Sequence, residues 1–126
     1  MRHVLLVNGH EDSRNVLRTA LEYRGYRVTD VGDSEAALDL VREQCPDVVV
    51  LELYLHPLDG QGLIEKLRAD EATARVPIVC LTSRVMTADR QSAMNAGADV
   101  FLPKPLTPTE VIKQVDQLVG AVPAGE

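Results

Sequence analysis

Five short apolar runs, separated by segments with helical periodicity, constrain the possible fold of this chain more than any other feature. The runs cover residues 4–7, 28–31, 48–51, 78–81 and 100–102. Each has the length of a strand and is rich in β-branched residues. Strict alternation of strands and helices predicts a parallel sheet with helices on both faces. The sequence therefore predicts an α/β fold with a doubly wound, five-stranded parallel sheet.

The composition of the runs predicts the order of the strands. Runs 4–7, 48–51 and 78–81 are apolar throughout, as central parallel strands must be. Run 28–31 contains Thr29 and Asp30, and run 100–102 ends at Pro103, so both suit the edges of the sheet. The predicted order is 2-1-3-4-5, as in flavodoxin-like folds. Sites in such sheets lie beyond the carboxyl ends of the strands, here between the first and third.

Capping residues and glycines predict where the helices begin and end. Glycines at 25 and 97 follow the first and fourth helical segments, as glycines at helix C-termini do. The segment 107–110, Thr-Pro-Thr-Glu, is typical of a capping box with proline in the first turn. We expect one domain over residues 1–120 and a tail over 121–126. The other expected N-caps are Asp12 or Ser13, Asp33 or Ser34, and Thr87.

Charge and composition exclude several classes of function. The chain has 126 residues, with 19 acidic and 13 basic side chains and a net charge of −6. An acidic balance disfavours binding to nucleic acid or to a membrane surface, and no apolar run approaches the roughly 20 residues of a membrane span. The N-terminus lacks the pattern of a signal peptide, and Cys45 and Cys80 form no disulfide framework. We expect a reduced, cytoplasmic protein.

Five motifs between residues 46 and 105 resemble those of a known family. They are PDVVVL at 46–51, DG at 59–60, VPIV at 76–79 with LT at 81–82, AGAD at 96–99 and FLPKP at 101–105. In this order and at this spacing, the chain resembles the receiver domains of two-component response regulators, the CheY-like superfamily. The resemblance covers nearly the whole sequence and implies the same five-stranded fold.

The resemblance implies phosphoryl transfer from a histidine kinase to an aspartate. That chemistry uses Mg²⁺ held by carboxylates, and a hydroxyl and an ammonium that hold the phosphoryl oxygens. Thr82 and Lys104 match the hydroxyl and ammonium positions. Asn8 and Gly9 stand where the family has an acidic pair, and Glu52 stands at the phosphoacceptor position.

These departures leave Glu52 open to three interpretations. Glu52 is a phosphoacceptor of altered length, a structural carboxylate paired with Lys104, or a mimic of the phosphorylated aspartate. The second and third interpretations are compatible, because Glu52 would mimic the phosphorylated aspartate by pairing with Lys104. With Asn8 and Gly9 in the acidic-pair positions, we expect weak Mg²⁺ binding or none. The acids at 11 and 12 lie nearby, but we expect them to stabilise the start of a helix.

Other residues near the predicted strand ends have both structural and functional interpretations. Thr82 and Phe101 match the family's switch pair, although Phe101 also fits as a half-buried aromatic on an edge strand. The peptide bond after Lys104 resembles the family's Lys-Pro bond, but the sequence does not fix its cis or trans state. We expect His10 and His56 to be exposed loop residues. The alternative is a transition-metal site that adds Glu52 or the acid at 11.

The combined expectation is an atypical receiver domain that works without phosphorylation, as a protein–protein interaction module in two-component-type signal transduction. No nucleophile with a base is visible, so we expect no enzyme. The partner would be a kinase, an effector or a scaffold. The alternatives are a working phosphoacceptor at Glu52 and a flavodoxin-like binder of a small ligand.

The resemblance also indicates a docking face, formed by the fourth helix, fifth strand and fifth helix. Family members that dimerise through this face use opposite charges on it. Val100 stands where a second acid often follows Asp99, so at most a weak homodimer is expected. The residues expected to be exposed on this face are Arg90, Met94, Asn95, Asp99, Phe101, Lys113 and Gln117.

Overall fold

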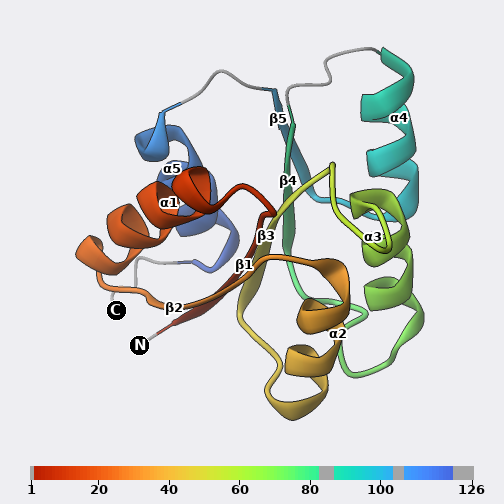
Figure 1. The fold of residues 1–126 in the computed structure, drawn as a ribbon, viewed down its shortest axis with the longest axis horizontal. Coiled ribbons are helices and arrows are strands. Elements are labelled where there is room, and N and C mark those ends of the chain that lie inside the picture. The colour runs from red at the N-terminus through yellow and green to blue at the C-terminus, as the bar shows by residue number, and fades with distance from the viewer. Residues whose placement is uncertain (1, 83–86, 104–106, 121–126) are drawn as a thin grey trace.

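Ten elements alternate between strand and helix in the computed structural model, which describes residues 2–82, 87–103 and 107–120 (Figure 1). The strands are β1 (His3–Val7), β2 (Arg27–Val31), β3 (Val48–Glu52), β4 (Ile78–Thr82) and β5 (Val100–Pro103). The helices are α1 (Glu11–Tyr23), α2 (Ser34–Glu43), α3 (Gly60–Ala69), α4 (Thr87–Ala96) and α5 (Pro108–Leu118).

The strands form one parallel sheet in the order β2-β1-β3-β4-β5, so the predicted order is confirmed. Every residue of β1, β3 and β4 is buried, whereas the residues of β2 are exposed or partly exposed. The apolar runs predicted to be central are therefore central. The register of β1 and β3 pairs Val7 with Leu51, which brings the ends of these strands to the same edge.

Two apolar cores lie on opposite faces of the sheet. Helices α1 and α5 lie on one face of the sheet, and α2, α3 and α4 lie on the other (Figure 1). Side chains of each group pack into the core on their own face. Alternation of side chains along β1 supplies both cores, with Val4 and Leu6 on one face and Leu5 and Val7 on the other.

Most of the predicted helix boundaries are found in the structure. Asp33 caps α2 by accepting from the Ala36 N–H, and Thr107 forms the predicted capping box of α5 with Glu110. Gly25 and Gly97 have φ values of 105° and 122°, which favour glycine. α4 begins at Thr87 itself, so Thr87 is its first helical residue, not its cap.

Arg68 of α3 joins the loops that precede β4 and β5. Its guanidinium donates to the carbonyl oxygens of Val76 at 2.7 Å, Gly97 at 3.0 Å and Ala74 at 3.1 Å. It also pairs with Asp99 at 3.0 Å, and the same carboxylate oxygen accepts from the Ile78 N–H. All of these contacts lie at the amino edge of the sheet, opposite the predicted site.

No helix in the described ranges combines the length and the apolar character needed to cross a membrane.

Candidate functional site

The carboxyl ends of β1, β3 and β4 bring Asn8, Glu52 and Thr82 to one edge of the sheet. Asn8 directly follows β1, while Glu52 and Thr82 are the last residues of β3 and β4. All three are buried, with exposed fractions of 2%, 7% and 0%. The polar side chains predicted at the switch point therefore lie at one edge, in an otherwise apolar setting. Lys104 and Pro105, expected beside them, lie outside the described residues.

The turn after β1 is held in place by backbone and side-chain contacts. The Asn8 N–H donates to the Val31 carbonyl, and the Asn8 carbonyl accepts from the Arg14 guanidinium at 2.8 Å. Arg14 is anchored in turn by Asp30 of β2 at 2.9 Å. Asn8 Oδ1 accepts from the His10 N–H at 2.8 Å, which fixes the orientation of its amide. Its Nδ2 is buried and has no hydrogen-bond partner within the described part of the chain.

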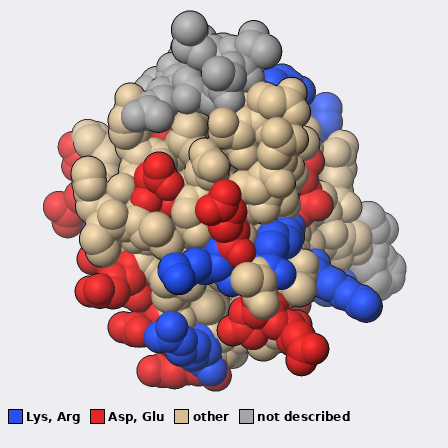
Figure 2. Space-filling model, turned by 90° about the vertical axis from the view of Figure 1, so that its right-hand side faces the viewer, with Lys and Arg blue, Asp and Glu red and all other residues tan. Residues whose placement is uncertain are grey.

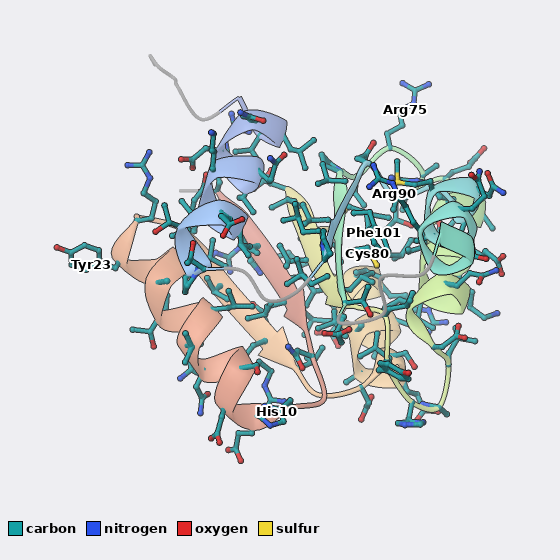
Figure 3. The ribbon with its side chains drawn as sticks, turned by 90° about the horizontal axis from the view of Figure 1, so that it is seen from above. His10, Tyr23, Arg75, Cys80, Arg90 and Phe101 are labelled. Carbon is teal, nitrogen blue, oxygen red and sulfur yellow. The ribbon has the colours of Figure 1, made fainter. Side chains whose placement is uncertain are left out.

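His10 is the N-cap of α1, which corrects the expectation that Asp12 or Ser13 caps it. The His10 ring nitrogen Nδ1 accepts from the Ser13 N–H at 3.3 Å. The helix starts earlier than expected because Asn8 closes a turn onto His10. A histidine ring takes the place of the short polar side chains that usually cap helices. Figure 3 shows His10 at the start of α1 and Tyr23 at its far end.

Glu52 carries the only carboxylate of the three strand-end residues. Its Oε2 accepts from the N–H of the next residue, Leu53, at 2.9 Å. Burial, together with the nearby Glu52 carboxylate, raises the pKa of the Cys80 thiol on β4 to about 12. Cys80 is therefore an inert part of the core, as its position in an apolar run predicts.

A pocket of about 460 Å³ opens at this edge of the sheet. Asn8 and Glu52 line it together with Gly9, and three exposed or partly exposed side chains, His10, Ser13 and His56, stand at its rim. Tyr54, which is 52% exposed, adds an aromatic ring.

Tyr54 and Ser13 were not predicted as site residues, although the sequence holds a signal for each. Tyr54 lies two residues after Glu52, in the segment that follows the carboxyl end of β3, where sites in such sheets are expected. Ser13 lies three residues after the capping residue His10, where a helix places the partner of its cap.

The residues of this pocket do not fit the magnesium ion that the resemblance implied. Mg²⁺ prefers carboxylate oxygens in octahedral geometry, but Asn8 supplies an amide and Gly9 supplies no side chain. Across the described ranges, no group of three or more His, Cys, Asp or Glu side chains is arranged to hold a metal ion. The alternative of a transition-metal site at His10 and His56 is therefore not supported, and both histidines are exposed.

Phe101 is buried, which corrects its expected exposure on the docking face. Only 8% of it is exposed, and it packs in the core that also contains Ala93 of α4 and Cys80. The Arg90 guanidinium lies over its ring, 5.9 Å from the centroid (Figure 3), within cation–π range. The aromatic ring is thus turned inward and covered from α4.

Apart from Phe101, the residues expected to be exposed on the docking face are exposed. Arg90, Met94 and Lys113 are exposed, as are Asn95 and Gln117. Asp99 is exposed as well, but its carboxylate bonds to Arg68 and to the Ile78 N–H of β4. Figure 2 views the side on which α3 and α4 lie, where basic and acidic side chains are interspersed and no broad basic surface forms.

Comparison with known proteins gives consistent matches along the chain. The family model for the response regulator receiver domain matches residues 4–116. The probable transcriptional regulator ycf27 of Guillardia theta is 38% identical over 108 residues, 86% of this chain and 41% of that protein. An uncharacterized 14.6 kDa protein of Leptolyngbya boryana is 32% identical over 120 residues, 95% of this chain and 92% of that protein.

Solved structures match over nearly the same range. The receiver domain of the sensor histidine kinase PA1611 from Pseudomonas aeruginosa PAO1, which coordinates a magnesium ion in its active site cleft, superimposes with a TM-score of 0.88. It is 31% identical, and the match covers 94% of this chain and 98% of that one. By contrast, this chain spans about half the length of several regulators that it matches, between 41% and 49%.

Proposed function

This chain belongs to the response regulator receiver domain family, and from that premise we propose that it is an atypical receiver that acts without phosphorylation. The family consists of signalling modules in two-component systems, so the proposed role is to bind another signalling protein in the cytoplasm. The observation that carries the proposal is the donor set at the strand ends, where Asn8, Gly9 and Glu52 offer one carboxylate.

One carboxylate is too few for the metal-assisted chemistry. Phosphoryl transfer to a carboxylate depends on a cation that neutralises the developing charge and orients the phosphoryl group. The Asn8 amide is neutral and already accepts from the His10 N–H, which reduces its ability to act as a metal ligand. Weak Mg²⁺ binding, or none, follows from this donor chemistry.

Glu52 supports a phosphate-independent state more readily than a phosphorylated one. Its side chain is one methylene longer than aspartate and turns back to bond the Leu53 N–H. In the proposed arrangement, it also pairs with Lys104 and supplies the negative charge that a phosphoryl group would bring. Phe101 is buried and Arg90 covers its ring. This packing supports one fixed conformation of β5, as a domain that is not switched by phosphorylation would have.

The proposed partner surface is the exposed part of α4, β5 and α5, where Arg90, Met94 and Lys113 are accessible. Met94 gives a flexible apolar contact and the two cations favour an acidic partner. A kinase, an effector or a scaffold remains the expected partner class, and a homodimer through this face would be weak.

Intact-mass measurement tests the proposal. The protein is incubated with Mg²⁺ and acetyl phosphate, and we expect no added phosphoryl group. The matched control is the triple variant Asn8→Asp, Gly9→Asp, Glu52→Asp, which should bind Mg²⁺. The control is sterically reasonable because a Cβ at Gly9 would lie 3.4 Å from its nearest neighbour, the Gly32 carbonyl. A phosphoryl group on Glu52 of the unmodified protein would instead establish the altered phosphoacceptor.

A further inference from the structure

The pocket at the switch point contains a buried hydrogen-bond donor that the described residues leave unused. We propose that this pocket binds an uncharged, planar heteroaromatic ligand of nucleobase size, which accepts a hydrogen bond from Asn8 Nδ2 and stacks against Tyr54. The inference rests on the proposed function, because a site that held Mg²⁺ and took phosphate would not leave this pocket available.

The Asn8 amide supplies the specificity. Its Oδ1 is bonded to the His10 N–H at 2.8 Å, so the end of the amide that has no partner among the described residues is Nδ2. The residue is 2% exposed and lines the pocket. A buried donor without a partner is costly, and a guest with a carbonyl oxygen or ring nitrogen removes that cost.

Aromatic side chains supply the walls. Tyr54 is 52% exposed at the mouth of the pocket, although tyrosine rings usually bury much of their surface. The rings of His10 and His56 stand on the same rim. Flat, exposed rings around one polar anchor suit a flat guest, because stacking on aromatic side chains tolerates any ring with a π-face.

The charges select against ionic guests. Among the described lining residues there is no lysine or arginine, and the buried Glu52 carboxylate lies in the wall. The proposed pair of Glu52 with Lys104 would occupy that ammonium, so an anion such as a phosphate would have no cation available to it. The described residues also offer no cluster that would hold a metal ion. An uncharged guest avoids both problems.

The size of the pocket agrees with this class of ligand. Its volume of about 460 Å³ falls in the range of small-molecule sites. Gly9 adds to the space, because a Cβ there would contact nothing closer than 3.4 Å. Close packing therefore does not require glycine at this position, and its missing side chain leaves room in the pocket.

Titration followed by NMR tests the inference on the whole chain. Adenosine and nicotinamide serve as uncharged probes, and AMP serves as the matched anionic probe. We expect adenosine and nicotinamide to shift the side-chain amide signals of Asn8, and AMP to bind more weakly than adenosine. Absence of any shift at millimolar probe, or AMP binding as tightly as adenosine, would overturn the inference.

Three variants locate the site. Asn8→Asp removes the donor with little change of shape, and Tyr54→Ala removes the stacking ring from an exposed position. Each should weaken adenosine binding about ten-fold. Tyr23→Ala is the control, since Tyr23 is 95% exposed at the far end of α1, and should leave binding unchanged. If Tyr54→Ala binds adenosine as the unmodified protein does, the proposed pocket is wrong. The intact-mass measurement is independent of these titrations, so failure of the ligand proposal alone is distinguishable from failure of the proposed function.

Discussion

Replacement of Arg68 by alanine should lower the free energy of unfolding by about 3 kcal/mol. In the folded protein the Arg68 guanidinium makes three close bonds to backbone carbonyls, those of Val76, Ala74 and Gly97, at 2.7 to 3.1 Å, and a weaker one at 3.5 Å to the Thr73 carbonyl. These carbonyls belong to the segments that lead into β4 and β5. The substitution removes the shared donor and leaves all three acceptors without it.

The magnitude follows from the number of bonds. A hydrogen bond within a protein contributes about 1 kcal/mol net, so three bonds give about 3 kcal/mol. The ion pair with Asp99 adds little, because that carboxylate is 43% exposed and exposed pairs contribute about 0.2–1 kcal/mol. Asp99 also keeps its bond to the Ile78 N–H, so its carboxylate is not left unpaired.

Urea unfolding of Arg68→Ala and of a matched control measures this difference. The control is Arg42→Ala, because Arg42 is 68% exposed and pairs only with Asp39 among the described residues. Its loss should cost no more than about 0.5 kcal/mol. Arg68→Lys should recover only part of the loss, since one ammonium cannot reproduce the fork of a guanidinium. Equal midpoints for Arg68→Ala and Arg42→Ala would refute the reasoning and would mean that water replaces the guanidinium at no cost.

Three further predictions follow from burial and close packing. Gly60→Ala should destabilise the fold by about 1–3 kcal/mol in thermal unfolding, because its Cβ would lie 2.7 Å from a backbone atom; Gly9→Ala, the matched control, should have little effect. Burial is the main cause that lowers the pKa of His3 below 6.5, so the unfolded chain binds the proton more readily and stability should fall as the pH drops below about 6.5; a His3→Asn variant that keeps the same pH dependence would exclude this cause. Iodoacetamide should modify the exposed Cys45 and spare Cys80 in the folded protein, although the raised pKa of Cys45 makes even that reaction slow; mass spectrometry of Cys80 labelled without denaturant would contradict this.

Most of the fold could be predicted because its signals are local. The capping box at Thr107 and the apolar runs of β1, β3 and β4 each depend on neighbours in sequence. The start of α1 could not be predicted in the same way. It depends on the Asn8 side chain bonding the backbone of His10, and the sequence alone does not decide between this turn and a cap at Ser13.

Contacts between distant segments account for the rest. The burial of Phe101 depends on how α4 lies over β5, which brings Arg90 onto its ring, and no local pattern sets that position. The role of Arg68 depends on carbonyls of the segments before β4 and β5. The sequence predicts a site at the strand ends, but the Asn8 donor left unpaired by the described residues depends on how its amide bonds the His10 N–H, which no local pattern specifies.

The amino and carboxyl ends of the strands have different roles in this protein. Arg68 and its carbonyl partners lie at the amino edge, whereas Asn8 and Glu52 lie at the carboxyl edge, one strand length of roughly 16 Å away. Effects of substitutions that far apart generally add. Residues at the carboxyl ends of the strands can therefore be substituted one at a time, while the contacts of Arg68 at the amino ends stay unchanged. That thermodynamic independence makes this chain a suitable scaffold on which acids can be added singly and the onset of metal binding measured.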